Sequence, residues 1–204
     1  MVGTGPAIVR LICLLLVLLS LGGRPLPLRA DDGAGLEYRL KAGFVVNFAR
    51  FVAWPASVWA GASSSLNLCI LGADPFGPAL AGVEEKQVAG HPIALRHTDT
   101  VPTTPGACHL LFVSRSEAGR LDRILAATAG LPVLTVSDIP GFAAKGGVFE
   151  FRRRDGRLTF VINNTRARAS GIQVSASLLA LALEVATPPT EIERSVYAKL
   201  TWRF

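Results

Sequence analysis

Residues 108–136 read CHLLFVSRSEAGRLDRILAATAGLPVLTV. Two almost wholly apolar runs, 108–113 and 131–136, stand at its ends. Between them, Leu121, Ile124 and Leu125 recur at the spacing of a helix that buries one face. Apolar strands joined by a helix are typical of neighbouring parallel strands, because two strands that run the same way need a long crossover. This segment therefore predicts an α/β fold.

The same pattern extends toward the N-terminus. The run 66–71, LNLCIL, predicts a buried strand, followed by a short helical piece around 76–83 and a weaker strand at 93–95. Upstream, residues 35–54 have helical periodicity, and we expect that helix to end at Trp54-Pro55. Its apolar positions recur at spacings of three and four, with Lys41, Asn47 and Arg50 elsewhere around the helix: Leu36, Leu40, Phe44, Phe48, Phe51 and Val52.

After residue 140 the pattern changes. GVFEFR (147–152) and LTFVI (158–162) flank RRDG (153–156), which is typical of an antiparallel hairpin. A final helix is predicted over 175–186. Together these elements predict a single three-layer α/β domain. It would have a mainly parallel central sheet, an antiparallel hairpin near the C-terminal end and helices on both faces.

Residues 1–30 have the features of an export signal. Arg10 precedes the apolar run LICLLLVLLSL (11–21), whose 11 residues are too few to span a bilayer. We expect cleavage after Ala30 and a soluble, exported product. The domain would then occupy 31–186, and the tail 187–204 would follow it.

Charge argues against nucleic-acid binding. Residues 1–30 hold three of the 21 basic residues and none of the 15 acidic ones, so the remaining chain has a net charge of about +3. An exported protein with so small an excess of positive charge has little support as a nucleic-acid binder.

No catalytic constellation is evident. His91, His97 and His109 belong to no metal-binding or nucleophile motif, and the chain contains no Cys-x-x-Cys or Gly-x-Ser-x-Gly. The loop GADPFG (72–77) has glycines at a phosphate-loop spacing but lacks the lysine that would meet phosphate charge. We therefore expect a protein that is not an enzyme and holds no metal or cofactor.

Polar residues follow three of the predicted strands, where parallel α/β sheets usually bind ligands. They form a candidate ligand or partner surface, although such residues also form turns and cap helices, as Ser116 would for the helix after it. The set is Asp74, Ser114, Ser116, Glu117, Ser137 and Asp138.

Two further surfaces are candidates for partner binding. Arg152, Arg153, Arg154 and Arg157 form a basic hairpin tip, which is either a solvated edge that deters strand pairing or a surface facing a partner or membrane. The amphipathic helix 36–53 and the final helix 175–186 are the other sources of exposed apolar surface.

Cys69 and Cys108 are the two cysteines outside residues 1–30. They are either two buried thiols or a disulfide. An oxidising compartment favours the disulfide. Adjacent strands lie about 4.8 Å apart, which is within the Cα range of a disulfide. We therefore predict that the two cysteines are bonded.

The order and spacing of several short motifs resemble the YfiR family of periplasmic proteins over about residues 36–185. The motifs are LKAGF (40–44), CILG (69–72), DPFG (74–77), CHLLFVS (108–114), LTVSD (134–138), FVIN (160–163) and SASLLALA (175–182).

This resemblance implies a periplasmic, dimeric repressor. Its partner would be the periplasmic sensor part of an inner-membrane diguanylate cyclase, and repression would lower cyclic di-GMP and biofilm formation. Membrane contact would come only through the partner. Cys69 and Cys108 match the family's disulfide positions, but 141–160 lacks the second cysteine pair of some relatives. Because partners differ within the family, a sensor subunit for a membrane histidine kinase is an alternative. A periplasmic small-ligand receptor that uses the strand-end loops is another.

Overall fold

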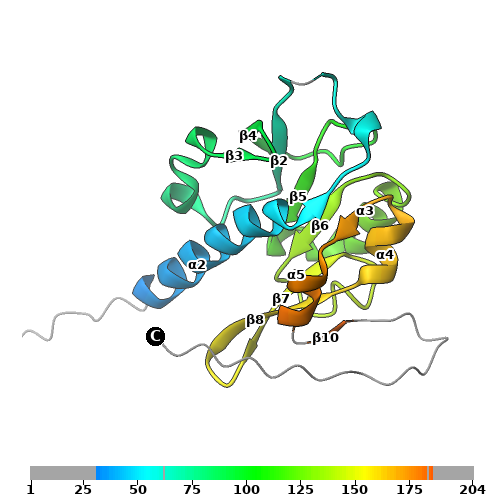
Figure 1. Ribbon diagram of the computed structural model, residues 1–204. Helices are drawn as coiled ribbons and strands as arrows, with labels where there is room; N and C mark the ends of the chain where they lie inside the picture. Colours follow the sequence, from blue (N-terminus) through cyan, green and yellow to red (C-terminus); the bar gives the residue numbers. More distant parts are fainter. Residues whose placement is uncertain (1–30, 62, 183, 186–204) are drawn as a thin grey trace, which may run out of the picture. The chain divides into compact units, whose positions relative to one another are not determined.

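The computed structural model describes residues 31–61, 63–182 and 184–185 (Figure 1). The predicted export signal, 1–30, and the predicted tail, 187–204, lie outside the described residues. From Ala34 onward, the described residues belong to one compact unit. Among them, no helix is long and apolar enough to cross a membrane.

The described helices are α2 (Asp31–Arg50), η1 (Ala56–Val58), η2 (Gly77–Leu80), η3 (Val83–Glu85), η4 (Arg115–Arg120), α3 (Leu121–Ala127), α4 (Asn164–Ala169) and α5 (Ala176–Leu181). The strands are β1 (Val52–Ala53), β2 (Leu66–Leu71), β3 (Gln87–Val88), β4 (His91–Thr98), β5 (Leu110–Val113), β6 (Leu134–Ser137), β7 (Phe149–Arg154), β8 (Arg157–Ile162), β9 (Gln173–Val174) and β10 (Glu184–Val185).

Within the described residues, eight strands form one sheet in the order β10-β8-β7-β6-β5-β2-β4-β3. Strands β4, β2, β5, β6 and β7 all run parallel, whereas β8 is antiparallel to β7 and β3 to β4. The predicted α/β class and mainly parallel sheet are therefore confirmed. The predicted hairpin is present, and its two-residue turn is Asp155-Gly156.

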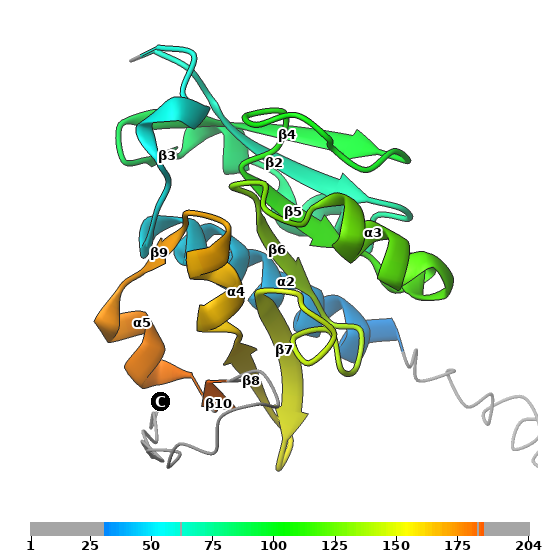
Figure 2. The same cartoon turned by 90° about the vertical axis from the view of Figure 1, so that its right-hand side faces the viewer.

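Alternate residues of the central strands contribute to two separate apolar clusters. Leu110 and Phe112 of β5 belong to the cluster that contains α2, and Leu111 and Val113 to the one that contains α3. Because successive side chains of a strand point to opposite faces, α2 and α3 pack on opposite sides of the sheet (Figure 2). On the α2 side, the rings of Phe48 and Phe149 stack with centroids 4.4 Å apart.

Helix α2 ends at Arg50, four residues before the predicted end. Val52 and Ala53 form β1 instead and pair antiparallel with Val174 and Gln173 of β9. The backbone amide of Ser175 also donates to the carbonyl of Phe51 at 2.9 Å. Pairing with the distant strand β9 therefore ends the helix before Pro55 does. The local sequence does not predict this pairing.

Only part of the apolar stripe predicted for this helix is buried. Leu36 and Leu40 are 58% and 50% exposed, whereas Lys41, which was placed off the apolar stripe, is 1% exposed. The buried face is formed instead by smaller residues together with Phe48: Ala42, Val45, Val46 and Ala49.

The final helix is also shorter than predicted. Ser175 caps α5 by accepting a hydrogen bond from the amide of Leu178, but the helix ends at Leu181 because Ala182 is extended. Glu184 and Val185 then pair with β8 at the edge of the sheet. The apolar run alone did not indicate that its last residues would leave the helix and pair with the edge of the sheet.

Two other local predictions need correction. Ser116 does not cap a helix, because it lies inside η4, and α3 begins only at Leu121. The sequence analysis also missed α4, which is capped by Asn163 through its bond from the amide of Arg166. Asn163 at this position was a usable signal, since Asn is a favoured N-cap.

Candidate functional site

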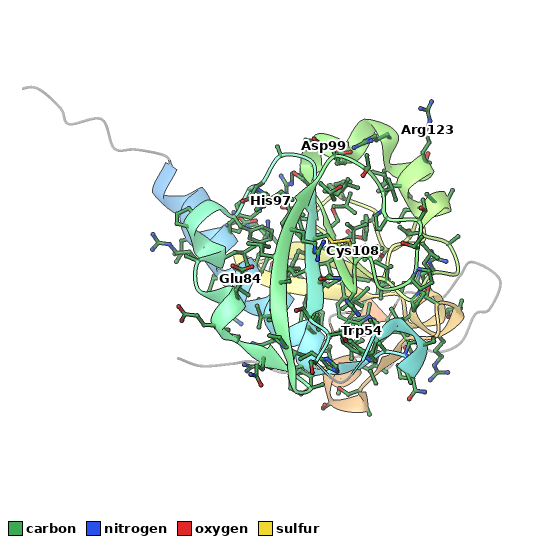
Figure 3. The ribbon with its side chains drawn as sticks, turned by 90° about the horizontal axis from the view of Figure 1, so that it is seen from above. Trp54, Glu84, His97, Asp99, Cys108 and Arg123 are labelled. Carbon is green, nitrogen blue, oxygen red and sulfur yellow. A yellow bond between two sulfur atoms is a disulfide. The ribbon has the colours of Figure 1, made fainter. Side chains whose placement is uncertain are left out.

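A disulfide joins Cys69 in β2 to Cys108, two residues before β5 (Figure 3). The Cα atoms are 5.9 Å apart, and both residues are buried. Strands β2 and β5 are neighbours in the sheet, as the prediction required. The predicted disulfide is therefore present, and it connects two central strands within the apolar cluster under α3.

Two tryptophans and two histidines form an aromatic cluster that includes His109, the residue after Cys108. The ring of Trp59 stacks between His91, at 3.7 Å between centroids, and His109, at 4.4 Å. Nδ1 of His109 accepts from the amide of Asn67 at 3.0 Å, and Trp54 Nε1 donates to the carbonyl of His109 at 3.1 Å. Burial lowers the pKa of His109 from its usual 6.5, and the charge of His91 acts in the same direction. Sequence spacing gave no sign of this cluster.

The residues predicted at the strand ends separate into two groups. The first group lies after the carboxyl ends of β2 and β5. Ser116 Oγ accepts from the amide of Ala73 at 3.0 Å, and Glu117 is paired with Arg120. Asp74 accepts from the amide of Phe76 at 2.8 Å, and its other oxygen lies 3.1 Å from His97 Nε2.

Gly72 brings the backbone close to this group. It has a φ of +85°, and a Cβ there would overlap Ser116 and Glu117. The strand order of the sheet reverses between β2 and β5, and α/β folds usually bind ligands at such a point. Asp74, Ser116 and Glu117 make turn and loop contacts there.

The second group lies over β5 and β6. Ser137 Oγ donates to the carbonyl of Val113 at 2.7 Å and accepts from the amide of Ile139 at 3.0 Å. The amide of Ser114 donates to the carbonyl of Leu71 at 3.0 Å. These two serines therefore hold strand ends together.

Asp138, which follows Ser137, is the centre of a charged cluster. Its Oδ2 accepts from Lys41 Nζ at 2.6 Å and from the Tyr38 hydroxyl at 2.9 Å, and Arg115 Nε lies 3.2 Å away. Lys41 Nζ is also 2.6 Å from Glu37. Burial, followed by the charge of Asp138, raises the pKa of Tyr38 to about 12.

This cluster attaches α2 to the carboxyl edge of the sheet. Three of its members, Glu37, Tyr38 and Lys41, come from one stretch of α2. Asp138 directly follows β6, and Arg115 is the first residue of η4, which follows β5. Asp138 was predicted from its place after a strand, but its partners on α2 were not, because periodicity only places Lys41 off the apolar stripe.

An open hollow of about 390 Å³ adjoins the cluster. Its lining includes three arginines, and each of them is near a carboxylate: Arg115 near Asp138, Arg152 near Glu150 and Arg153 near Glu37. The positive charges are therefore balanced within the protein. Among the described residues, no group of His, Cys, Asp and Glu is placed to hold a metal ion.

Large apolar side chains are exposed on the elements that the sequence analysis proposed for partner contact. They lie on α2, just after it, and on α5 and β10: Leu36, Leu40, Phe51, Leu181 and Val185.

These features define an α/β domain with a disulfide across two central strands and one long helix attached by a buried ion cluster. Residues 38–183 match the model of a family described as YfiR/HmsC-like. Because this match covers most of the chain, the protein belongs to the YfiR/HmsC-like family. The match includes both bonded cysteines, Asp138 and its partner Lys41.

Proposed function

We propose that this protein is a non-catalytic periplasmic regulator. It binds the periplasmic sensor part of an inner-membrane diguanylate cyclase and represses it, which lowers cyclic di-GMP and biofilm formation. The observation that carries the proposal is the family match over residues 38–183. The Cys69–Cys108 disulfide supports an oxidising compartment, which agrees with the export signal expected in residues 1–30.

The repressor would act by binding one conformation of its partner more tightly than the other. Exposed apolar side chains near the end of the domain suit such a contact. Phe51, Leu181 and Val185 are each about 40% exposed. The amide of Ser175, just before α5, donates a hydrogen bond to the carbonyl of Phe51. We assign the domain to residues 31–186, as three layers, and expect it to form a homodimer.

The disulfide would act as a structural crosslink in this regulator. It lies in the core and connects strands 39 residues apart in sequence. Reduction would weaken the fold and so relieve repression. Residues 141–160 hold no second cysteine pair that could form a redox switch. Sensitivity to reductant would therefore come only from the loss of stability.

Co-purification tests the proposal. A tagged protein in its own bacterium is crosslinked, and membrane proteins bound to it are identified. We expect a membrane protein with a periplasmic part and a cyclase output, and we expect its yield to fall in the double variant Leu181→Ser, Val185→Ser. The control variant Arg123→Ser, on α3, should leave the yield unchanged. Recovery of no such membrane protein would oppose the proposal.

A small-ligand receptor, or a sensor subunit for a histidine kinase, is the second candidate. The open hollow of about 390 Å³ beside Asp138 is the observation that favours a ligand. A thermal-shift screen distinguishes the two: a ligand at 100 times its Kd adds about 2.7 kcal/mol to stability. A shift of that size that is lost in Arg152→Ser would support the receptor.

A further inference from the structure

We propose that the open hollow between α3, α4 and residues 141–147 binds the phosphate group of a small molecule. The hollow has a volume of about 440 Å³ and is lined by Asp122, Leu125, Ala126, Lys145, Gly146 and Arg166. We call it the phosphate hollow, and it is distinct from the hollow beside Asp138. The inference goes beyond the proposed function, because a repressor that binds only its partner needs no small ligand.

Two hydrogen bonds hold α4 to the other walls of the phosphate hollow. Asn163, the residue before α4, donates through Nδ2 to the carbonyl of Ala143 at 2.9 Å. Arg166, inside α4, donates through Nη2 to the carbonyl of Thr128, the residue after α3, at 3.0 Å. The three walls are therefore connected to one another, so the hollow is a fixed part of the folded domain.

Arg166 gives this hollow a positive charge that the described part of the protein does not balance. Burial lowers the pKa of Arg166, and no carboxylate among the described residues acts in the opposite direction. A guanidinium has five N–H donors, and the bond to Thr128 uses one of them. Arginines often bond the last carbonyls of a helix, but that role accounts for this single donor alone. The other donors suit an oxyanion, which a guanidinium can bind through two parallel hydrogen bonds.

Lys145 supplies a second positive charge from another wall. Its Nζ lies 3.1 Å from Asp122 of α3, and the two side chains are 52% and 82% exposed. An ion pair so exposed to solvent contributes little to stability, so Lys145 can turn from Asp122 to a bound anion at low cost. An anion in the hollow would therefore meet Arg166 and Lys145 together.

Positive charge predominates on the three segments that form the hollow. Helix α3, residues 141–147 and helix α4 hold four basic residues and one acidic residue: Arg123, Lys145, Arg166, Arg168 and Asp122. Two carboxylates next to these segments are already paired. Glu117, before α3, pairs with Arg120, and Glu150, which accepts from two amides of the 141–147 segment, pairs with Arg152. The excess of positive charge therefore remains for an anionic ligand.

A phosphate group fits this hollow better than a carboxylate or an acidic protein segment does. A phosphate monoester has a charge of about −2 and three acceptor oxygens, which matches two cations on different walls, whereas a carboxylate has a single charge. The volume of about 440 Å³ is within the range of about 300–1,000 Å³ that small-molecule sites occupy. The ligand class is therefore a small molecule with a phosphate group.

Isothermal titration calorimetry tests the proposal, using protein purified from the periplasm. The probes are inorganic phosphate, glycerol 3-phosphate and succinate, at low salt and about pH 8, where phosphate is a dianion. We expect both phosphates to bind, and succinate to bind more weakly than either. Arg166→Gln should weaken the binding of glycerol 3-phosphate by about tenfold or more, because it removes a charged hydrogen-bond donor. Lys145→Gln should weaken it about threefold.

Two further variants distinguish this hollow from general attraction to a basic protein. Asp122→Asn should strengthen binding about threefold, because it removes a negative charge and the competing partner of Lys145. Arg96→Gln, at an exposed position on β4, removes one positive charge elsewhere and should leave the Kd unchanged. Lys145, Asp122 and Arg96 are exposed, so melting temperatures without ligand should not change in these three variants.

Three results would overturn the proposal. The first is that neither phosphate binds at millimolar concentration, which would leave an acidic protein segment as the partner of this basic surface. The second is an equal loss of affinity in Arg96→Gln and Arg166→Gln, or no gain in Asp122→Asn. The third is succinate binding as tightly as glycerol 3-phosphate. The titration contains no membrane protein, so none of these results depends on the cyclase.

Discussion

The ammonium of Lys41 lies 2.6 Å from the carboxylate of Asp138, and the two side chains are each 2% exposed although 97 residues separate them. The pair connects the longest helix to the carboxyl edge of the sheet. A buried charge is costly unless it is paired, so the two residues must be kept or lost together.

Lys41→Met should lower the free energy of unfolding by about 3 kcal/mol, near the lower end for a broken buried pair. Arg115 and Tyr38 would still contact Asp138, which limits the loss. Urea denaturation measures the effect. The control is Lys145→Met, because Lys145 pairs with Asp122 at the surface and should lose less than about 0.5 kcal/mol. Equal losses in the two variants would contradict the account of this cluster.

The Tyr38 hydroxyl should ionise near pH 12. Burial and the neighbouring Asp138 carboxylate both disfavour a phenolate at this position. Ultraviolet absorbance in a Tyr197→Phe background, which leaves Tyr38 as the single tyrosine, follows the titration. In Asp138→Asn the pKa should move part of the way back toward 10, because the burial effect remains. An unchanged pKa in that variant would show that Asp138 does not act on Tyr38.

Cys69→Ser should destabilise the protein by about 4 kcal/mol in the chain-entropy model, since the disulfide closes a loop of 39 residues. Its abundance in the periplasm should fall, and the strain should behave like a deletion. The parent protein, prepared without residues 1–30, should show no free thiol after denaturation without reductant. Two free thiols per chain, or a stable and fully repressing Cys69→Ser protein, would contradict this role.

Acid should destabilise the protein through His109. Its pKa is lowered in the folded state, so the unfolded chain takes up a proton near pH 6.5 before the folded one does. The free energy of unfolding should therefore fall as pH drops below about 6.5. His109→Gln should flatten this dependence. Denaturation curves of the parent and of this variant at several pH values measure it, and identical slopes in the two proteins would refute the assignment.

Sequence patterns predicted the elements whose signals are local. The strands around Cys69, Leu111 and Val136 are buried apolar runs, and all three lie in the parallel part of the sheet as expected. The disulfide followed from those strands being neighbours. The pattern failed where a distant segment decides the outcome, as with the end of α2 at Arg50 and the end of α5 at Leu181.

The candidate site was predicted in part, for the same reason. Asp138 was proposed from its place after a strand, but Lys41 was only placed off the apolar stripe of its helix and was not proposed for a site. Only the folded structure brings its counter-ions to it. Ser116 and Glu117 were likewise proposed from their place after a strand, and the structure adds that they lie against Gly72.

The central claim is that this family member represses a diguanylate cyclase. Cyclic di-GMP should be quantified in the source bacterium with the gene deleted, and again with the gene restored. The account predicts that cyclic di-GMP rises on deletion and returns to the parental level on restoration. An unchanged level of cyclic di-GMP in the deletion strain would contradict it.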